Sequence, residues 1–201
     1  MHEARVRSAL RNDSGVASPG PLRIFEEFWI PRTRQRADLV VLNGKMVAFE
    51  IKTAADSLRR LPKQVSGYSS IFDLCTLVAD ERHLEVADQI VPDWWGLWLI
   101  DDSHEIPQFS EVRASTPNSR PDPEVLVRLL WRDEAYRVAS ELGCEPGESA
   151  CRSTLWQQIL SETDTAALAE LVRAALHRRD PEAARIESRS ARRLQEDLRS
   201  A

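Results

Sequence analysis

The sequence predicts an α/β protein, in which a mixed sheet flanked by helices is followed by a small all-helical C-terminal region. Short apolar runs of strand length alternate with amphipathic segments in the first half of the chain, and Asn43-Gly44 separates two of these runs. After residue 105 a proline-rich stretch interrupts this pattern, and only helical spacing follows it. With 201 residues, 42% of them hydrophobic, the chain can form one domain with an appendage or two small domains.

The first half predicts eight elements in the order α-β-β-β-α-β-α-β. Apolar spacing predicts helices over 4–10, 61–73 and 82–91. Aromatic and β-branched residues predict strands over 24–30, 37–42, 46–52, 75–79 and 96–101. The second and third strands are apolar at nearly every position, as is typical of strands covered on both faces, and Asn43-Gly44 between them is a strong hairpin signal.

Changes in composition divide the chain into four regions. Residues 1–105 are expected to form the sheet domain, and 106–123, with four prolines, a linker. Residues 124–180 are expected to form a helical region, with helices over 124–143, 154–163 and 164–179. The Arg- and Glu-rich residues 181–201 are expected to be a flexible tail.

Composition also bears on the compartment and the partners. The three cysteines fit no disulfide framework or zinc pattern, which favours a cytoplasmic protein, and no apolar run reaches the length of a membrane span. The net charge of −5 argues against a nucleic-acid partner. However, residues 23–63 contain nine Lys or Arg and five acidic residues, a local balance compatible with phosphate binding.

Asp38, Glu50 and Lys52 are charged residues in otherwise apolar strands. Burying such groups is costly unless they are paired or coordinated. Glu50 and Lys52 are two residues apart on a strand, so their side chains share one face and Ile51 points to the other. The three charged residues are therefore expected either to form a structural ion cluster or to hold a ligand.

The hairpin register decides whether Asp38 can join Glu50. A two-residue turn at Asn43-Gly44, the default for this dipeptide, would leave the two carboxylates on opposite faces. A three-residue loop would pair Leu42 with Met46 and place Asp38 directly across from Glu50, and a bulge would change the parity in the same way. Because like charges opposite each other are destabilising, this register needs a reason, and a divalent cation supplies one.

The two carboxylates, the Ile51 carbonyl and water molecules would be hard oxygen ligands that suit Mg²⁺ (or Mn²⁺). Lys52 beside them could orient or help to deprotonate an attacking water and stabilise a charged transition state, as in metal-assisted phosphodiester hydrolysis.

This arrangement resembles the PD-(D/E)xK nuclease superfamily, which has the restriction-endonuclease-like fold. Asp38 is followed after eleven residues by Glu50-Ile51-Lys52, and Gln64 and Tyr68 are similar to the Q-x-x-x-Y element of the RecB-like branch. Ala37 stands where the motif has its proline. The resemblance covers about residues 1–102; residues 82–100, with LLWRDEA and STLWQQI further on, are similar to a small uncharacterised family of bacterial nuclease-like proteins.

The resemblance implies a role for each motif residue. Asp38 and Glu50 would bind the metal ion, and Lys52 would be the catalytic lysine. Gln64 would orient the lysine or a phosphate, although it also fits the polar face of a helix. Related enzymes often add a glutamate from a helix ahead of the first strand; Glu3 is the candidate for it, and Glu27 competes with it. Because a strand alternates faces, only one of Glu26 and Glu27 can face the site, and the sequence does not decide which. Nucleic acid is expected to contact Arg34, Arg36, Lys63 and Tyr68, the last of which also fits a packed aromatic.

The expected function is that of a Mg²⁺-dependent nuclease that hydrolyses phosphodiester bonds, with DNA favoured as the substrate, in a repair, phage or defence context. The alternative is a non-cleaving module on the same fold that binds nucleic acid or a protein. The C-terminal helices faintly resemble DNA-binding modules of the SAP type. They fit an interaction or capping role equally well, so a protein partner is expected there.

Overall fold

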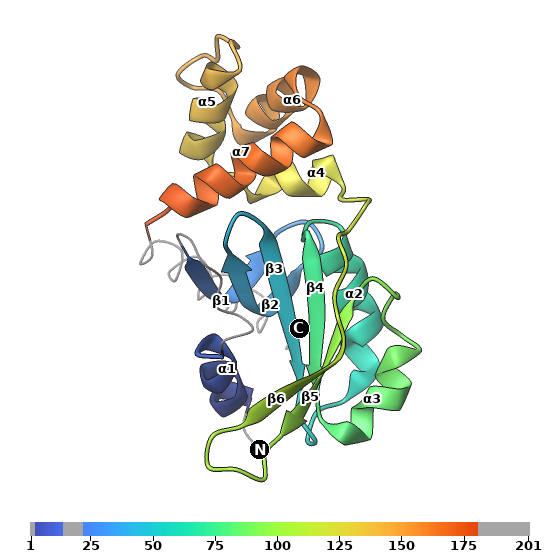
Figure 1. Ribbon diagram of the computed structural model, residues 1–201. Coiled ribbons are helices and arrows are strands. Elements are labelled where there is room, and N and C mark those ends of the chain that lie inside the picture. Colours follow the sequence, from blue (N-terminus) through green and yellow to red (C-terminus); the bar gives the residue numbers. More distant parts are fainter. Residues whose placement is uncertain (1–2, 14–21, 181–201) are drawn as a thin grey trace, which may run out of the picture.

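The structure, a computed structural model, describes residues 3–13 and 22–180 (Figure 1). These residues form an α/β protein whose mixed sheet has six strands. The eight elements expected in the first half are present in the expected order, with a 3₁₀ turn, η1 (Leu58–Arg60), added before the second helix. Their bounds are α1 Glu3–Arg11, β1 Arg23–Ile30, β2 Gln35–Leu42, β3 Met46–Lys52, α2 Leu61–Ser69, β4 Leu74–Ala79, α3 Glu81–Asp88 and β5 Gly96–Asp101.

The strands lie side by side in chain order, from β1 to β6 (Gln108–Arg113). The pairs β1–β2, β2–β3 and β5–β6 are antiparallel, and β3, β4 and β5 are parallel. A parallel pair needs a crossover connection. Helix α2 provides it between β3 and β4, and α3 provides it between β4 and β5.

Both faces of the central strands are covered, as their apolar sequences predict. On one face, Val6 and Leu10 of α1 pack against Leu39, Val41 and Phe49. The alternate residues of β2 and β3 enter a larger core on the other face, with side chains of α2 and of the C-terminal helices. Figure 1 shows α1 on one side of the sheet and α2 and α3 on the other.

The expected linker, residues 106–123, is wrong in part because it contains strand β6. This strand pairs with β5 at the edge of the sheet, and most of its residues are exposed or half-buried. An edge strand that is largely exposed needs no apolar alternation, which explains why its polar sequence, QFSEVR, did not indicate a strand.

The C-terminal region is helical, as expected. It comprises α4 (Pro123–Leu126), η2 (Val127–Leu129), α5 (Arg132–Glu141), α6 (Arg152–Glu162) and α7 (Thr165–Arg178). The single helix expected over 124–143 is broken because Leu130 and Trp131 are extended, with ψ of 126° and 166°. The Glu134 carboxylate then accepts a 2.8 Å hydrogen bond from the Trp131 N–H and caps α5. The expected flexible tail, 181–201, lies outside the described residues.

The helical region rests on one end of the sheet (Figure 1). Val125, Leu129 and Leu130 belong to the same buried cluster as the sheet residues. Arg173 of α7 forms an ion pair with Asp73, just before β4, at 2.9 Å. The apolar core is therefore continuous across the expected domain boundary. In the part of the chain that the structure describes, no helix combines the length and the apolar character required to cross a bilayer.

Candidate functional site

The turn between β2 and β3 has the three-residue form that the site requires. Leu42 pairs with Met46, and Leu39 pairs with Phe49. Inside the turn, the Asn43 N–H donates to the Lys45 carbonyl at 3.2 Å, and Gly44 has a φ of +87°, which glycine adopts without strain. The sequence-based prediction of the register is confirmed.

Asp38 lies where β2 and β3 separate. Their pairing ends at Leu39 and Phe49, and continuing this register places Asp38 across from Glu50. Beyond this point the Ile51 N–H donates not to the backbone of β2 but to the Asp38 carboxylate, at 2.8 Å. The Ile51 side chain is buried on the α1 face, as expected. The expected role of its carbonyl as a metal ligand stays a prediction.

Glu50 is held by three side chains. Its side chain is 1% exposed, and Lys52 Nζ and Gln64 Nε2 both donate to its Oε1 atom. The Tyr68 hydroxyl lies between Glu50 Oε2 and the Arg36 carbonyl, at 2.7 Å from the latter. Gln64 therefore contacts Glu50 and not the lysine amine in this structure. Its own Oε1 atom is buried and has no hydrogen-bond partner among the described residues.

Tyr68 corrects one sequence-based prediction. Its side chain is 0% exposed and stacks on Trp95 with ring centroids 5.8 Å apart. A fully buried ring offers no atom to nucleic acid, so the expected contact between Tyr68 and nucleic acid is wrong. Tyr68 instead positions Glu50, because its hydroxyl donates a hydrogen bond to the Glu50 carboxylate in the interior.

A second group of carboxylates meets at Asp38. Glu3 from α1 and Glu27 from β1 each bring one oxygen to Asp38, and the three oxygens lie within 4.8 Å of one another. Glu27 has a φ of 57°, which is unusual for a residue other than glycine inside a strand. Such backbone strain costs about 1–3 kcal/mol and is often found at functional sites. Both candidates for the additional glutamate are thus beside Asp38.

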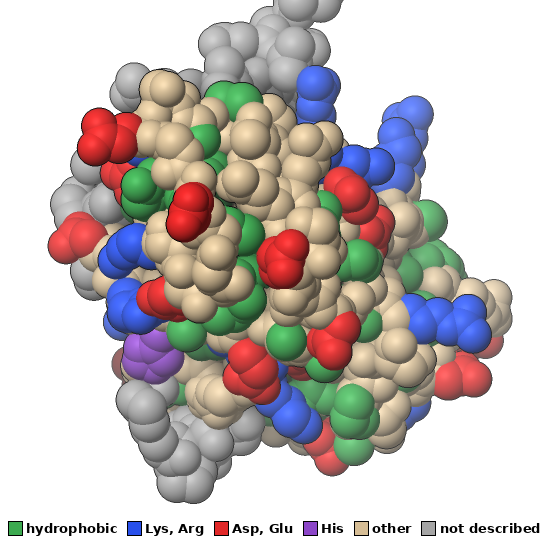
Figure 2. All heavy atoms as spheres, turned by 90° about the horizontal axis from the view of Figure 1, so that it is seen from above, with side chains coloured by type: hydrophobic (Ala, Val, Ile, Leu, Met, Phe, Trp, Pro, Cys, Tyr) green, Lys and Arg blue, Asp and Glu red, His purple; other side chains and the backbone are tan. Residues whose placement is uncertain are grey.

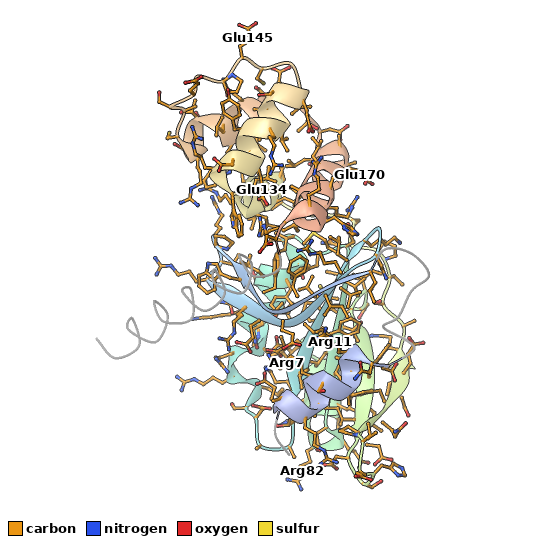
Figure 3. All side chains as sticks on the ribbon, turned by 90° about the vertical axis from the view of Figure 1, so that its left-hand side faces the viewer. Arg7, Arg11, Arg82, Glu134, Glu145 and Glu170 are labelled. Atoms are coloured by element: carbon orange, nitrogen blue, oxygen red, sulfur yellow. The ribbon has the colours of Figure 1, made fainter. Side chains whose placement is uncertain are left out.

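Two arginines balance part of this negative charge. Arg7 Nη1 lies 2.5 Å from Glu27 Oε1, and Arg36 Nη1 lies 2.8 Å from Glu27 Oε2. Arg7 also lies 3.6 Å from Glu3, one turn away on α1, and Figure 3 shows it between α1 and the sheet. Arg7 was not among the expected site residues, although the spacing of four residues between Glu3 and Arg7 was a signal for an ion pair. Arg36, expected to contact nucleic acid, is occupied by Glu27.

The electrostatics of Asp38 are unusual. Burial raises the pKa of the Asp38 carboxyl well above its ordinary value, and the nearby Glu50 and Glu3 raise it further. The hydrogen bond from Ile51 and the charge of Lys52 lower this pKa only in part. The buried Asp38 carboxylate is therefore destabilised when no cation is bound.

The remaining predicted contacts lie on the surface. Arg34 is exposed in the β1–β2 turn, and Lys63 is exposed on α2, one residue before Gln64. The structure thus brings Asp38, Glu50, Lys52 and Gln64 together in the interior, and it places Arg34 and Lys63 outside.

Comparisons with known proteins identify the family. The family model described as bacteriophage P4 protein cII matches residues 4–199. Protein cII of Enterobacteria phage P4 is 27% identical over 120 residues, which cover 60% of this chain and 46% of that protein. The matched part is thus about half the length of this relative. No solved structure matches the chain. Because the family model covers nearly the whole sequence, the chain belongs to the bacteriophage P4 protein cII family.

Proposed function

We propose that this protein is a nuclease that depends on Mg²⁺ or Mn²⁺ and hydrolyses phosphodiester bonds in DNA, on a restriction-endonuclease-like PD-(D/E)xK fold. The observation that carries the proposal is the register set by the three-residue turn, in which the Asp38 carboxylate accepts a hydrogen bond from the N–H of Ile51, the residue between Glu50 and Lys52. All three side chains are less than 10% exposed, at 7%, 1% and 4%. A less common turn that gathers three charges in an apolar sheet is expected at a site that binds an ion.

The residues present fit a divalent cation. The carboxylates of Glu3, Glu27 and Asp38 converge within 4.8 Å and offer only hard oxygen donors, the type that Mg²⁺ prefers. Glu50, expected to bind the ion together with Asp38, is not among these three, and its role as a ligand stays a prediction. Burial raises the pKa of the Asp38 carboxyl, and the negative charges of Glu50 and Glu3 raise it further, so a cation bound here would stabilise the carboxylate. Such a cation, when bound, polarises the phosphate and favours ionisation of a water molecule.

The protein's own groups would perform the remaining steps. Lys52 donates a hydrogen bond to Glu50, which holds its ammonium group in one position. From there the ammonium group can stabilise negative charge that develops on the phosphate. Gln64 and Tyr68 hold the Glu50 carboxylate, so it does not have to reorganise during the reaction. Burial of the three charged side chains removes competing water and strengthens each of these interactions.

The proposal is tested with purified protein, duplex DNA, single-stranded DNA and RNA, in Mg²⁺, Mn²⁺ or EDTA. We expect cleavage in the metal ions and none in EDTA. Glu50→Gln and Lys52→Ala should each lower the rate by at least about 100-fold, the scale of a lost acid–base group. Glu85→Gln is the matched control, because Glu85 is exposed on α3 and is not one of the carboxylates that converge at Asp38. Wild-type rates in Glu50→Gln, or cleavage in EDTA, would refute the assignment.

One observation favours the alternative, a module that binds without cleaving. Both oxygens of Glu50 already have partners within the protein, as in a structural ion cluster. The same experiment separates the two functions. Nucleic-acid binding in EDTA without cleavage in either metal ion would favour the binding module.

A further inference from the structure

Two segments of the chain without acidic residues meet beside the candidate site. Residues 28–37 and 57–72 contain six Lys or Arg and no Asp or Glu, in a protein whose net charge is −5. The first segment spans the end of β1, the turn and the start of β2, and the second spans η1 and α2. The Tyr68 hydroxyl lies 2.7 Å from the Arg36 carbonyl and joins the two segments.

The helical geometry of α2 places charged residues of the second segment along one face. Arg60, Lys63 and Gly67 follow one face of the helix, because residues three and four positions apart are neighbours. Gly67 lies so close to the β1–β2 turn that an added Cβ atom would be 2.7 Å from Gln35 Cγ and 3.0 Å from Thr33 Oγ1. The glycine therefore allows the turn that carries Arg32 and Arg34 to pack closely against α2.

The basic surface defined in this way consists of the exposed side chains Arg32, Arg34, Arg59, Arg60 and Lys63. None of Arg32, Arg59, Arg60 and Lys63 forms an ion pair with another described residue. By contrast, Arg7 and Arg36 both pair with carboxylates. Four exposed cations that form no such ion pair and share one surface favour a polyanion as ligand.

The same helix connects this surface to the site. Gln64 and Tyr68 follow Lys63 and Gly67 by one residue each and reach Glu50 in the interior. From Arg60 to Gly67 the helix axis extends about 10 Å, at about 1.5 Å per residue. A strand of duplex DNA presents about three phosphates over that length, at about 3.4 Å of rise each. A backbone held on the basic surface would thus follow the helix whose buried face, through Gln64 and Tyr68, holds Glu50.

The absence of exposed aromatic residues points to a duplex. All Phe, Trp and Tyr residues of the chain lie among the described residues, and each of them is buried or half-buried. Surfaces for single strands generally add aromatic side chains on which bases stack. The helical region is an unsuitable alternative, because residues 123–180 contain seven Arg and ten Asp or Glu. Figure 2 shows acidic side chains spread over this end of the molecule.

We infer that Arg32, Arg34, Arg59, Arg60 and Lys63 bind the phosphate backbone of duplex DNA, independently of its sequence, and deliver it to the site. The part of this inference that concerns the catalytic site rests on the proposed function. The binding of DNA to the basic surface can be tested without cleavage.

The test is fluorescence anisotropy of the full chain with a labelled duplex DNA and with one of its strands, in EDTA over a series of salt concentrations. The test variant is R59Q/R60Q/K63Q, and the matched control is R137Q/R152Q/R178Q, which removes the same charge from exposed arginines of the helical region. The slope of log K against log salt is negative, and each lost phosphate contact reduces its magnitude by about 0.9, so the magnitude should fall by about 2.7 in the test variant. In R32Q/R34Q it should fall by about 1.8.

We expect the control to keep the wild-type slope and the wild type to prefer the duplex. An unchanged slope in the test variant, an equal loss in the control, a preference for the single strand, or no binding of duplex at low salt would each overturn the inference. Thermal unfolding of each variant checks that it remains folded. Cleavage is measured separately: binding with the expected slopes but no cleavage would refute the nuclease alone, and cleavage with an unchanged slope would refute the basic surface alone.

Discussion

Replacing Asp38 by Asn should stabilise the metal-free protein. The raised pKa of Asp38 means that the folded chain resists ionisation of this carboxyl more than the unfolded chain does. Below about pH 4 the group is protonated in both states and has no effect. As the pH rises toward the folded-state pKa, stability is lost. Asn removes the charge and keeps an oxygen that can accept the hydrogen bond from the Ile51 N–H.

The size of the effect follows from the linkage. Each unit by which the pKa is raised costs about 1.4 kcal/mol at a pH above it. In a chain of this length, 1 kcal/mol changes Tm by about 2–4 °C. Asp38→Asn should therefore raise Tm in EDTA by about 3–6 °C for each unit of the pKa shift, at a pH above the folded-state pKa.

Thermal unfolding from pH 4 to 8 measures this effect, with Asp102→Asn as a control for removal of an exposed carboxylate. The difference between Asp38→Asn and the wild type should vanish near pH 4 and increase with pH, while Asp102→Asn follows the wild type. Mg²⁺ should stabilise the wild type more than Asp38→Asn, because a ligand stabilises only the state that binds it. A Tm difference that does not depend on pH, or equal stabilisation by Mg²⁺, would refute this reasoning.

Two further predictions concern the helical region. A chain ending at Ser119 should aggregate or unfold without cooperativity in circular dichroism, because Val125 and Leu129 complete the core shared with the sheet; a soluble, cooperative fragment would contradict this. Glu134→Ala should destabilise the protein by about 3–5 kcal/mol in urea unfolding, since it removes one partner of a buried ion pair, the carboxylate that lies 2.6 Å from Arg179, which is 6% exposed. A double variant with both side chains replaced by Leu should recover part of this loss, and a single variant as stable as the double one would argue against the pair.

The elements that could be predicted are those whose residues fit only one environment, such as apolar strands that must be buried. Strands buried on both faces read as apolar runs, and β2 and β3 were found where such runs predict them. The register around Gly44 could be predicted because only a three-residue turn puts Asp38 and Glu50 on the same face of the sheet, as a shared site requires. By contrast, β6 has exposed polar residues, and its pairing with β5 is visible only in three dimensions. The break at Trp131 depends on a cap from Glu134 that apolar periodicity does not reveal.

The candidate site shows the same division. Asp38, Glu50 and Lys52 could be identified because charges in apolar strands are exceptional. The choice between Glu26 and Glu27 could not be made, because alternation assumes regular backbone angles and Glu27 has a positive φ. Arg7 was missed because a Glu and an Arg four residues apart also occur on ordinary solvated helices.

The charges of the site argue against a purely structural cluster. Glu50 is compensated by Lys52, and Glu27 is compensated twice, by Arg7 and Arg36. Asp38 is 7% exposed and forms no ion pair with any described residue, so a structural cluster explains every charge except this one. An uncompensated buried carboxylate is costly in any protein, and two further carboxylate oxygens near it increase that cost. A bound divalent cation would convert the repulsion among these oxygens into ligation, which is why the response of the Asp38 variant to Mg²⁺ separates an ion site from a structural cluster.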